Sequence, residues 1–238
     1  MVLSMITALG WEARQLDADM AYLEAEVEEE IYVEASRPIK EGNRSQADPC
    51  VFRRILHGIV VVVIMVYVDD LLVASAAKRD ENQAERDLCS CFPIKDLGEA
   101  SYYLGCHITR DRNAGTLKCD QHQYIQTVAE RFGVTKTSII PSAAGGKSLS
   151  KSDSQQTGAE VEEMRQIPYR EIFGVLMWAA TMTRADISFA AHQLANFNDN
   201  PGPTHWRAAQ KALQYLWRTR DVGITYRGEP GGGGKLSA

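Results

Sequence analysis

The sequence predicts an α+β fold in which an antiparallel sheet with helices is followed by an all-helical region. An apolar run over residues 59–68 suits a buried central strand, because a membrane span would need about 20 apolar residues. Shorter apolar stretches in the first half are separated by turn residues, as in hairpins. Later in the chain, apolar residues recur at intervals of three and four, as on the buried face of a helix.

The first half divides into short elements. We expect, in chain order, a helix over 2–9, strands over 12–18 and 51–55, a hairpin formed by 59–68 and 71–74, a helical stretch over 78–91, and a second hairpin formed by 102–109 and 116–119. The carboxylate of Asp17 then lies on or at the end of the first strand.

The second half is helical in period. The apolar stripes cover 124–132, 169–180, 187–194 and 206–217. Thr204 is the expected N-cap of the last helix. A Ser-, Gly- and charge-rich stretch predicts a flexible linker, and four consecutive glycines predict a disordered tail. The predicted organisation is therefore a mixed part over 1–141, a linker over 142–166, a helical part over 167–227 and a tail over 228–238.

The composition is that of an ordinary globular protein, with 45% apolar and 24% charged residues among 238. A formal net charge of −5 does not by itself favour nucleic-acid binding, but the charge is unevenly placed. The stretch from Asp17 to Glu34, both included, contains eight acidic residues and no basic one. Basic residues dominate late in the chain, at Arg207, Lys211, Arg218, Arg220 and Arg227. We expect this basic surface to bind phosphate groups.

The five cysteines indicate reduced thiols in an intracellular compartment. Their number is odd, none forms a Cys-x-x-Cys pair, and no signal peptide or membrane span is visible, so no membrane partner is expected. A zinc site is an alternative whose spacing matches no common pattern. Its ligands would come from Cys89, Cys91, His107, Cys119 and His122.

Two adjacent acids, Asp69 and Asp70, separate the long apolar run from the next apolar stretch. An Asp pair at a hairpin is ordinarily a solvated turn, because Asp is favoured there. The alternative is a metal site, since Mg²⁺ prefers carboxylate oxygens and binds substrate phosphates through the same shell. A two-metal site holds its ions about 3.5–4 Å apart and needs a further acid from another strand. Asp17 is the candidate for that acid.

The stretch QLDADMAYLEAEVEEEIYVE, which contains Asp17, resembles the first catalytic motif of the reverse transcriptases of copia-type retrotransposons. The YVDD sequence over 67–70 matches the second catalytic motif of that family. Further motifs of the family follow in the same order along the chain. They are FPIKDLG over 92–98, residues 102–105, residues 169–177, TRADI over 183–187, and the stretch over 205–216 that begins with His205-Trp206. Each motif alone is weak, whereas the ordered set, running from about residue 11 to 227, is specific.

The resemblance implies an RNA-directed DNA polymerase with a truncated palm over 1–141 and a thumb- or connection-like region over 167–227. Its chemistry would be nucleotidyl transfer with two Mg²⁺ or Mn²⁺ ions, and its partners a deoxynucleotide and an RNA/DNA template–primer. The chain would derive from a polyprotein that also contains integrase and RNase H.

The family's functional residues carry over position by position. Asp17, Asp69 and Asp70 would be the catalytic acids and the metal ligands. The side chain of Tyr22 would pack under the nucleotide sugar, and the backbone carbonyl of Ala18 would help to hold the nucleotide metal. Contacts to the nucleic acid would come from Tyr67, Tyr103, Leu104, Gly105, Arg207 and Lys211.

The chain departs from the family pattern in two places. Few residues precede Asp17, where the family has its fingers, and the G-L-K-Q-[AS]-P-R-x-W segment that contacts template and nucleotide is missing before Asp48. Three hypotheses result. The chain is an RNA-directed DNA polymerase domain that works, alone or within a larger polyprotein. Alternatively, it is a degenerate or partial copy that keeps the palm acids but has lost activity, which is the interpretation we favour. In the third hypothesis, it is a catalytically dead remnant that acts at most as a nucleic-acid or protein binding module.

Overall fold

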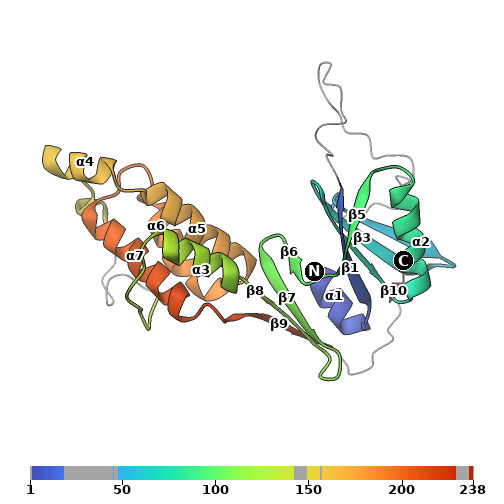
Figure 1. Ribbon diagram of the computed structural model, residues 1–238. Helices are drawn as coiled ribbons and strands as arrows, with labels where there is room; N and C mark the ends of the chain where they lie inside the picture. Colours follow the sequence, from blue (N-terminus) through green and yellow to red (C-terminus); the bar gives the residue numbers. More distant parts are fainter. Residues whose placement is uncertain are drawn as a thin grey trace, which may run out of the picture. The chain divides into compact units, whose positions relative to one another are not determined.

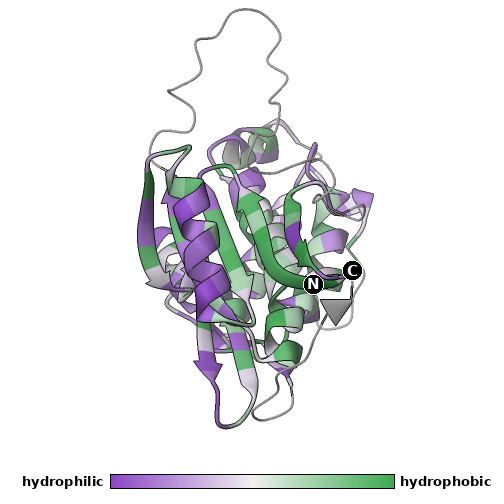
Figure 2. Cartoon of the chain, turned by 90° about the vertical axis from the view of Figure 1, so that its right-hand side faces the viewer, coloured by the Kyte–Doolittle hydropathy of each residue, from purple (hydrophilic) through white to green (hydrophobic). Residues whose placement is uncertain are grey.

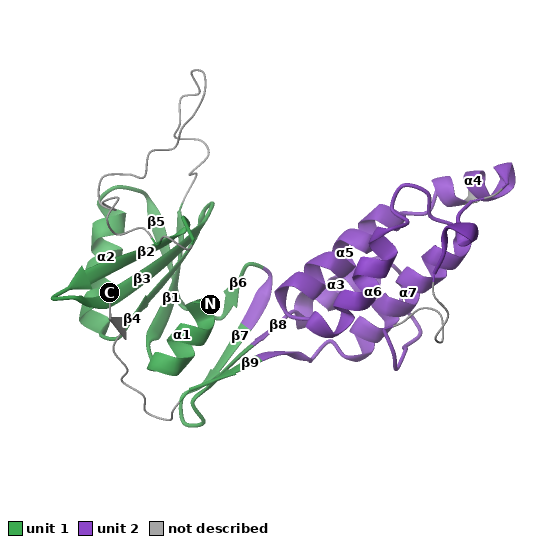
Figure 3. Cartoon of the chain, turned by 180° about the vertical axis from the view of Figure 1, so that it is seen from behind, with its two compact units in different colours: residues 1–104, 108–118, 225–238 green, residues 105–107, 119–224 purple. Residues whose placement is uncertain are grey.

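The computed structural model describes residues 2–18, 45, 48–141, 149–155, 157–228 and 236–237. The chain forms two compact units (Figure 3), the first from 1–104, 108–118 and 225–238, and the second from 105–107 and 119–224. The predicted α+β class is confirmed. The sequence analysis predicted a boundary after residue 141, whereas the second unit already includes residues from 119 onward. The reason is that the helix over His122–Arg131 packs into the core formed by the later helices.

The first unit is built on a six-stranded sheet with strand order β10-β3-β4-β1-β5, in which β2 also pairs with β3 (Figure 1). All of these pairs are antiparallel. In chain order, the elements are α1 (Val2–Leu9), β1 (Glu12–Ala18), β2 (Val51–Leu56), β3 (Ile59–Tyr67), β4 (Asp70–Ser75), α2 (Lys78–Cys89), β5 (Ile94–Glu99) and β10 (Leu236–Ser237). The apolar run therefore forms an inner strand, as expected.

Each face of this sheet is covered by one helix. Side chains along β4 alternate, so Leu71 and Val73 face α2 while Leu72 and Ala74 face α1. Leu88 is one of the residues with which α2 fills its side. Figure 2 shows the hydrophobic strands behind the mostly hydrophilic α2. A half-polar helix on a hydrophobic sheet is the usual two-layer solution for burying both apolar surfaces.

Arg14 connects β1 to its neighbours through three carboxylates. Its guanidinium lies 3.3 Å from Glu81 and 2.7 Å from Glu85, both on α2, and 2.7 Å from Asp96 on β5. The Glu81 side chain is 1% exposed, so it needs a cation, and Lys78 supplies a second one at 2.7 Å. This network holds in place the strand that carries Asp17.

A four-stranded sheet has the order β6-β7-β8-β9, and the division between the units falls within its strands. Its strands are β6 (Tyr102–Tyr103), β7 (Cys106–Asp111), β8 (Thr116–Asp120) and β9 (Gly223–Arg227). The rest of the second unit contains α3 (His122–Arg131), α4 (Gly158–Arg165), α5 (Tyr169–Met182), α6 (Ser188–Ala195), α7 (Pro203–Arg218) and the 3-10 turns Lys151–Asp153 and Ala185–Ile187. Its core lies between α3, α5, α6 and α7.

Three expectations differ from the structure. The stretch predicted as a flexible linker contains α4, whose N-cap Thr157 accepts a hydrogen bond from the backbone N–H of Glu160 in a capping box. The predicted tail contains β10, which pairs with β3. The N-cap of α7 is Gly202 instead of Thr204, because Pro203, with its fixed φ and missing N–H, suits the first helical position.

In the described part of the chain, no helix is long and apolar enough to cross a membrane.

Candidate functional site

The pairing of β1 with β4 brings the two predicted catalytic motifs together. Asp17 lies directly opposite Asp70 in this pair, and Tyr67 lies opposite Asp70 in the pair of β3 with β4. Residues opposite each other in an antiparallel ladder point to the same face, with Cβ atoms about 4.5–5.5 Å apart. The carboxylates of Asp17 and Asp70 are therefore neighbours on one face of the sheet.

The turn between β3 and β4 is strained. Its two residues are Val68 and Asp69, and Val68 has a φ of 56°. A β-branched residue in this left-handed region is an outlier that costs about 1–3 kcal/mol. The backbone N–H of Ala18 donates to the carbonyl of Asp69 at 2.9 Å, which fixes the turn against the end of β1. Strain of this kind persists where the surrounding structure enforces it, often at functional sites.

The acids supply the donor chemistry of a divalent metal site. Oδ1 of Asp69 is buried and has no hydrogen-bond partner among the described residues. A buried carboxylate oxygen is costly unless something satisfies it, and oxygen donors are those that Mg²⁺ prefers. The residues thus fit such an ion in donor type. Among the described residues, however, no three His, Cys, Asp or Glu side chains are gathered as they would be to hold a metal ion.

Two further side chains surround Asp70. Nε2 of Gln15 donates to Oδ1 of Asp70 at 3.4 Å, a contact that the sequence analysis missed. The spacing of Gln15 and Asp17 along one strand, two residues apart, is the signal that would have revealed it. Tyr103 is 4% exposed, and its hydroxyl finds no hydrogen-bond partner within the described ranges. Burial, and then the negative charge of Asp70, raise the pKa of Tyr103, so the phenol stays protonated.

The predicted nucleic-acid and nucleotide contacts lie in different environments. Tyr103 is part of the core of the first unit, whereas Tyr67 is 54% exposed. Leu104 and Gly105 have φ values of 50° and 76° and form the two-residue turn between β6 and β7, as expected for a tight hairpin of the I′ kind. Ala18 is the last residue of β1, and Tyr22 lies outside the described residues.

The predicted basic pair lies on α7 of the second unit. Arg207 and Lys211 are four residues apart and therefore share one helix face. The Arg207 guanidinium is exposed and donates to Oγ1 of Thr204 at 3.2 Å. Across the described ranges, neither cation has a carboxylate within ion-pair distance. Their charge is thus not neutralised by a described neighbour.

The T-R-A-D-I motif of the second unit is structural. Arg184 is fully buried, and its guanidinium donates to both carboxylate oxygens of Asp186 at 2.9 and 2.8 Å. It also donates to the carbonyl and the hydroxyl of Thr219 at 2.9 and 2.6 Å. These bonds join the end of α5 to the end of α7.

The zinc alternative is not supported. All five of its ligands lie among the described residues, which contain no group suited to a metal ion. Cys89 and Cys91 are exposed, whereas Cys119 is buried in another unit.

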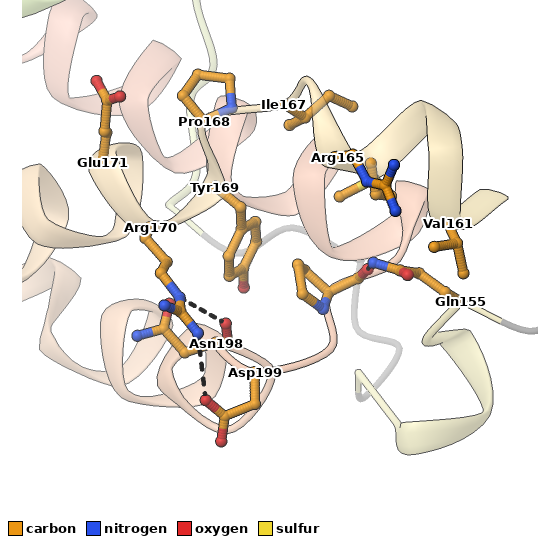
Figure 4. Close-up of a pocket in the computed structure, with 12 residues that line it drawn as sticks. Gln155, Val161, Arg165, Ile167, Pro168, Tyr169, Arg170, Glu171, Asn198 and Asp199 are labelled. Atoms are coloured by element: carbon orange, nitrogen blue, oxygen red, sulfur yellow. Dashed lines mark hydrogen bonds and ion pairs between the residues drawn. The ribbon is translucent and has the colours of Figure 1, made fainter.

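A pocket of about 360 Å³ lies in the second unit, between α4, the start of α5 and the loop after α6 (Figure 4). On its wall, Arg170 donates to the carbonyl of Asn198 at 3.4 Å and lies 3.6 Å from the carboxylate of Asp199. None of the residues predicted for catalysis or nucleic-acid binding lines it.

Comparison with known proteins agrees with the resemblance in the sequence. Residues 39–143 match the family described as reverse transcriptase (RNA-dependent DNA polymerase). The chain is 30% identical over 252 aligned positions to the retrovirus-related Pol polyprotein from transposon TNT 1-94 of Nicotiana tabacum, which covers 90% of this chain and 19% of the polyprotein. It is also 30% identical over 171 positions to a putative transposon Ty5-1 protein of Saccharomyces cerevisiae, covering 70% of this chain and 52% of that protein.

The retrovirus-related Pol polyprotein from transposon RE1 of Arabidopsis thaliana is 25% identical over 260 positions, covering 94% of this chain and 17% of that polyprotein. The chain therefore spans about a fifth to a half of the length of these relatives. No solved structure matches it.

Proposed function

Since this chain carries the reverse transcriptase region of copia-type Pol polyproteins, we propose that its first unit is a polymerase palm whose nucleotide incorporation is impaired. In this proposal, Asp17, Asp69 and Asp70 are the metal-binding acids. The substrates are a deoxynucleotide and an RNA/DNA template–primer. The larger protein of origin is a polyprotein with integrase and RNase H, working in a cytoplasmic particle or the nucleus.

The observation that carries the proposal is the placement of Asp17 opposite Asp70, beside the strained turn at Val68. A solvated Asp pair would favour a relaxed turn with both carboxylates in water. Here Val68 adopts a left-handed φ, and one buried oxygen of Asp69 has no hydrogen-bond partner in the part of the chain that the structure describes. Both features are costly for a turn without another role.

Each residue has a defined part in the proposed reaction. When bound, two divalent ions would lower the pKa of the primer 3′-hydroxyl and neutralise charge on the triphosphate and the leaving pyrophosphate. Asp17 and Asp69 would hold these ions, and the carbonyl of Ala18 would contribute at the end of β1. Asp70, oriented by Gln15, would support Asp17 across the strand pair.

Two features support impairment. The internal segment that contacts template and nucleotide in the family is missing before Asp48. Phosphoryl transfer depends chiefly on positioning and charge stabilisation, so the loss of these contacts should be severe. The predicted acids also do not gather into one cluster of three in the described part of the chain.

Nucleic-acid binding without chemistry is the second candidate function. The cations Arg207 and Lys211 share one face of α7 and have no carboxylate partner among the described residues. Such a face attaches to phosphates regardless of sequence, and its affinity falls steeply with salt.

Three measurements on the full chain test these proposals. In primer extension on poly-rA/oligo-dT with Mg²⁺ or Mn²⁺, the natural chain should give no more product than the Asp69→Asn variant. Product from the natural chain that is absent with Asp69→Asn would refute the impairment and would support the catalytic role of the acids. Titration with Mn²⁺ should show binding that Asp17→Asn and Asp69→Asn both weaken, and unchanged binding in both variants would refute the metal site. A gel shift of the template–primer that weakens with added salt, and also in the double variant Arg207→Ala/Lys211→Ala, would support nucleic-acid binding by this helix face. Equal shifts with the natural chain and the double variant would refute such binding.

A further inference from the structure

Residues 149–155 of the second unit form a strap that packs against the beginning of α7. At one end of the strap, Nε2 of Gln155 donates to the carbonyl of Pro201 at 2.8 Å. In its middle, the strap touches the N-cap of α7: a Cβ on Gly202 would lie 2.0 Å from the carbonyl oxygen of Asp153. The strap and the start of α7 therefore meet along their backbones, where no side chain separates them.

His205 makes a third contact with the strap, and it does so through a neutral ring. The side chain is buried, with 0% of its surface exposed. Its Nδ1 accepts a hydrogen bond from the backbone N–H of Gly202 at 2.9 Å, and its Nε2 lies 3.2 Å from the carbonyl oxygen of Ser150. Because Nδ1 accepts, the single proton of the neutral ring is on Nε2, which donates to that carbonyl. The ring also stacks on Phe197, with centroids 3.9 Å apart.

A second proton on this imidazole is incompatible with these contacts. Protonated Nδ1 is a donor, and it would face the N–H of Gly202, which is also a donor. Burial lowers the pKa of His205, while the carbonyl of Ser150 and the carboxylate of Asp153 act in the opposite direction. The other charged residues of the surrounding segments, Lys151, Asp199 and Arg207, are exposed. Protonation therefore favours a state in which the ring leaves its buried position.

The strap is a segment that can separate without the rest of the unit. Its sequence, LSKSDSQ, contains one apolar residue, Leu149, which is half-buried against the core. The core itself lies between α3, α5, α6 and α7. Segments that bury little apolar surface open at a lower free energy than the core elements of the same protein. Gln155 and Pro201 also line the pocket in Figure 4, so separation of the strap would open that side of the pocket.

We propose that residues 149–155 are an acid-released strap, which protonation of His205 detaches from the start of α7 while the helical core stays folded. The contact is complete above pH 6.5, because the folded-state pKa of His205 lies below that value. As the pH falls from 6.5 through the folded-state pKa, the ratio of released to attached strap should rise by up to about tenfold per pH unit, because one proton is taken up on release.

Nuclear magnetic resonance of the full chain, titrated from about pH 7.5 to about pH 5, tests this proposal. The imidazole signals of His205 should change with a midpoint below pH 6.5. The amide signals of Gly202 and of residues 150–155 should change with the same midpoint. The amide signals of Ile172 and Leu176, which lie in the core, should stay constant over the same range.

Two variants identify the group that titrates. His205→Gln should keep the strap attached throughout, because a side-chain amide accepts through its oxygen and donates through its nitrogen but takes up no proton in this range. The matched control is His192→Gln, which removes an exposed histidine of α6 whose Nδ1 lies 2.8 Å from the Ser188 carbonyl oxygen. This control should leave the transition of the strap unchanged.

Three results would overturn the proposal. The first is an unchanged transition of residues 150–155 in His205→Gln. The second is constant amide signals of 150–155 over the whole range in the natural chain. The third is a simultaneous loss of the strap signals and the core signals, because the acid would then unfold the unit as a whole.

Discussion

Arg184 gives the strongest test of how the second unit is held together. The side chain is fully buried and donates four hydrogen bonds, two to Asp186 and two to Thr219. The hydroxyl of Tyr215 also donates to Asp186, at 2.8 Å, and the Arg184 guanidinium lies 5.5 Å from the Tyr215 ring centroid. Removing one partner of a buried pair leaves the other charge and its acceptors unpaired.

We expect Arg184→Ala to lower the free energy of unfolding by about 3–4 kcal/mol. Breaking a buried pair costs about 3–5 kcal/mol, and the lower part of that range applies because the Asp186 side chain is 36% exposed. Arg184→Lys keeps the charge but loses the planar fork, so it should cost about half as much. Urea unfolding of the full chain, followed by circular dichroism, measures both.

The control is Arg79→Ala. The Arg79 side chain is 85% exposed and lies 3.4 Å from Asp80, so its loss should change stability by less than about 0.5 kcal/mol. Burial raises the pKa of Asp186, but hydrogen bonds from Arg184 and Tyr215 outweigh it and leave the pKa below 3.8. Arg184→Ala should therefore move the pKa of Asp186 upward in a carbon-detected titration. Equal small losses in Arg184→Ala and Arg79→Ala, with no shift at Asp186, would refute this account.

Three further predictions concern single positions. Val68→Gly should raise the free energy of unfolding, measured in urea, by about 1 kcal/mol, because glycine tolerates a φ of 56°. The same increase in Val68→Ala would count against backbone strain as the cause. Gly202→Ala should lower the free energy of unfolding by about 1–3 kcal/mol, because the new Cβ would lie 2.0 Å from the Asp153 carbonyl oxygen. Gly174→Ala is the control, because a Cβ at Gly174 would meet open space and should not lower the stability in this way. Burial lowers the pKa of His205 below 6.5. The stability contributed by neutral His205 is therefore complete above pH 6.5 and is lost as the pH falls through the folded pKa. His205→Gln should make the urea midpoint less dependent on pH in that window, and an unchanged pH dependence would exclude His205 as its source.

The sequence alone determined the local elements of this protein. The apolar run before Asp69 predicted β3, and the 3.6-residue periods predicted α3, α5 and α7, because burying one face requires such patterns. The ordered motifs also predicted the reverse transcriptase family, which the comparisons show independently. The Thr157 capping box was present in the sequence as well, but a composition rich in polar residues hid the short helix that it starts.

Only the tertiary structure decided what lies beside what. The register that sets Asp17 opposite Asp70 joins residues far apart in the chain, and no local pattern fixes such a pairing. The positive φ of Val68 arises because the turn is held between paired strands, against the ordinary preference of a β-branched residue. Likewise, the packing of α5 against α7 buries Arg184 with Asp186 as its partner. Local preferences depend on neighbours along the chain, whereas these placements depend on contacts that exist only once the whole chain has folded.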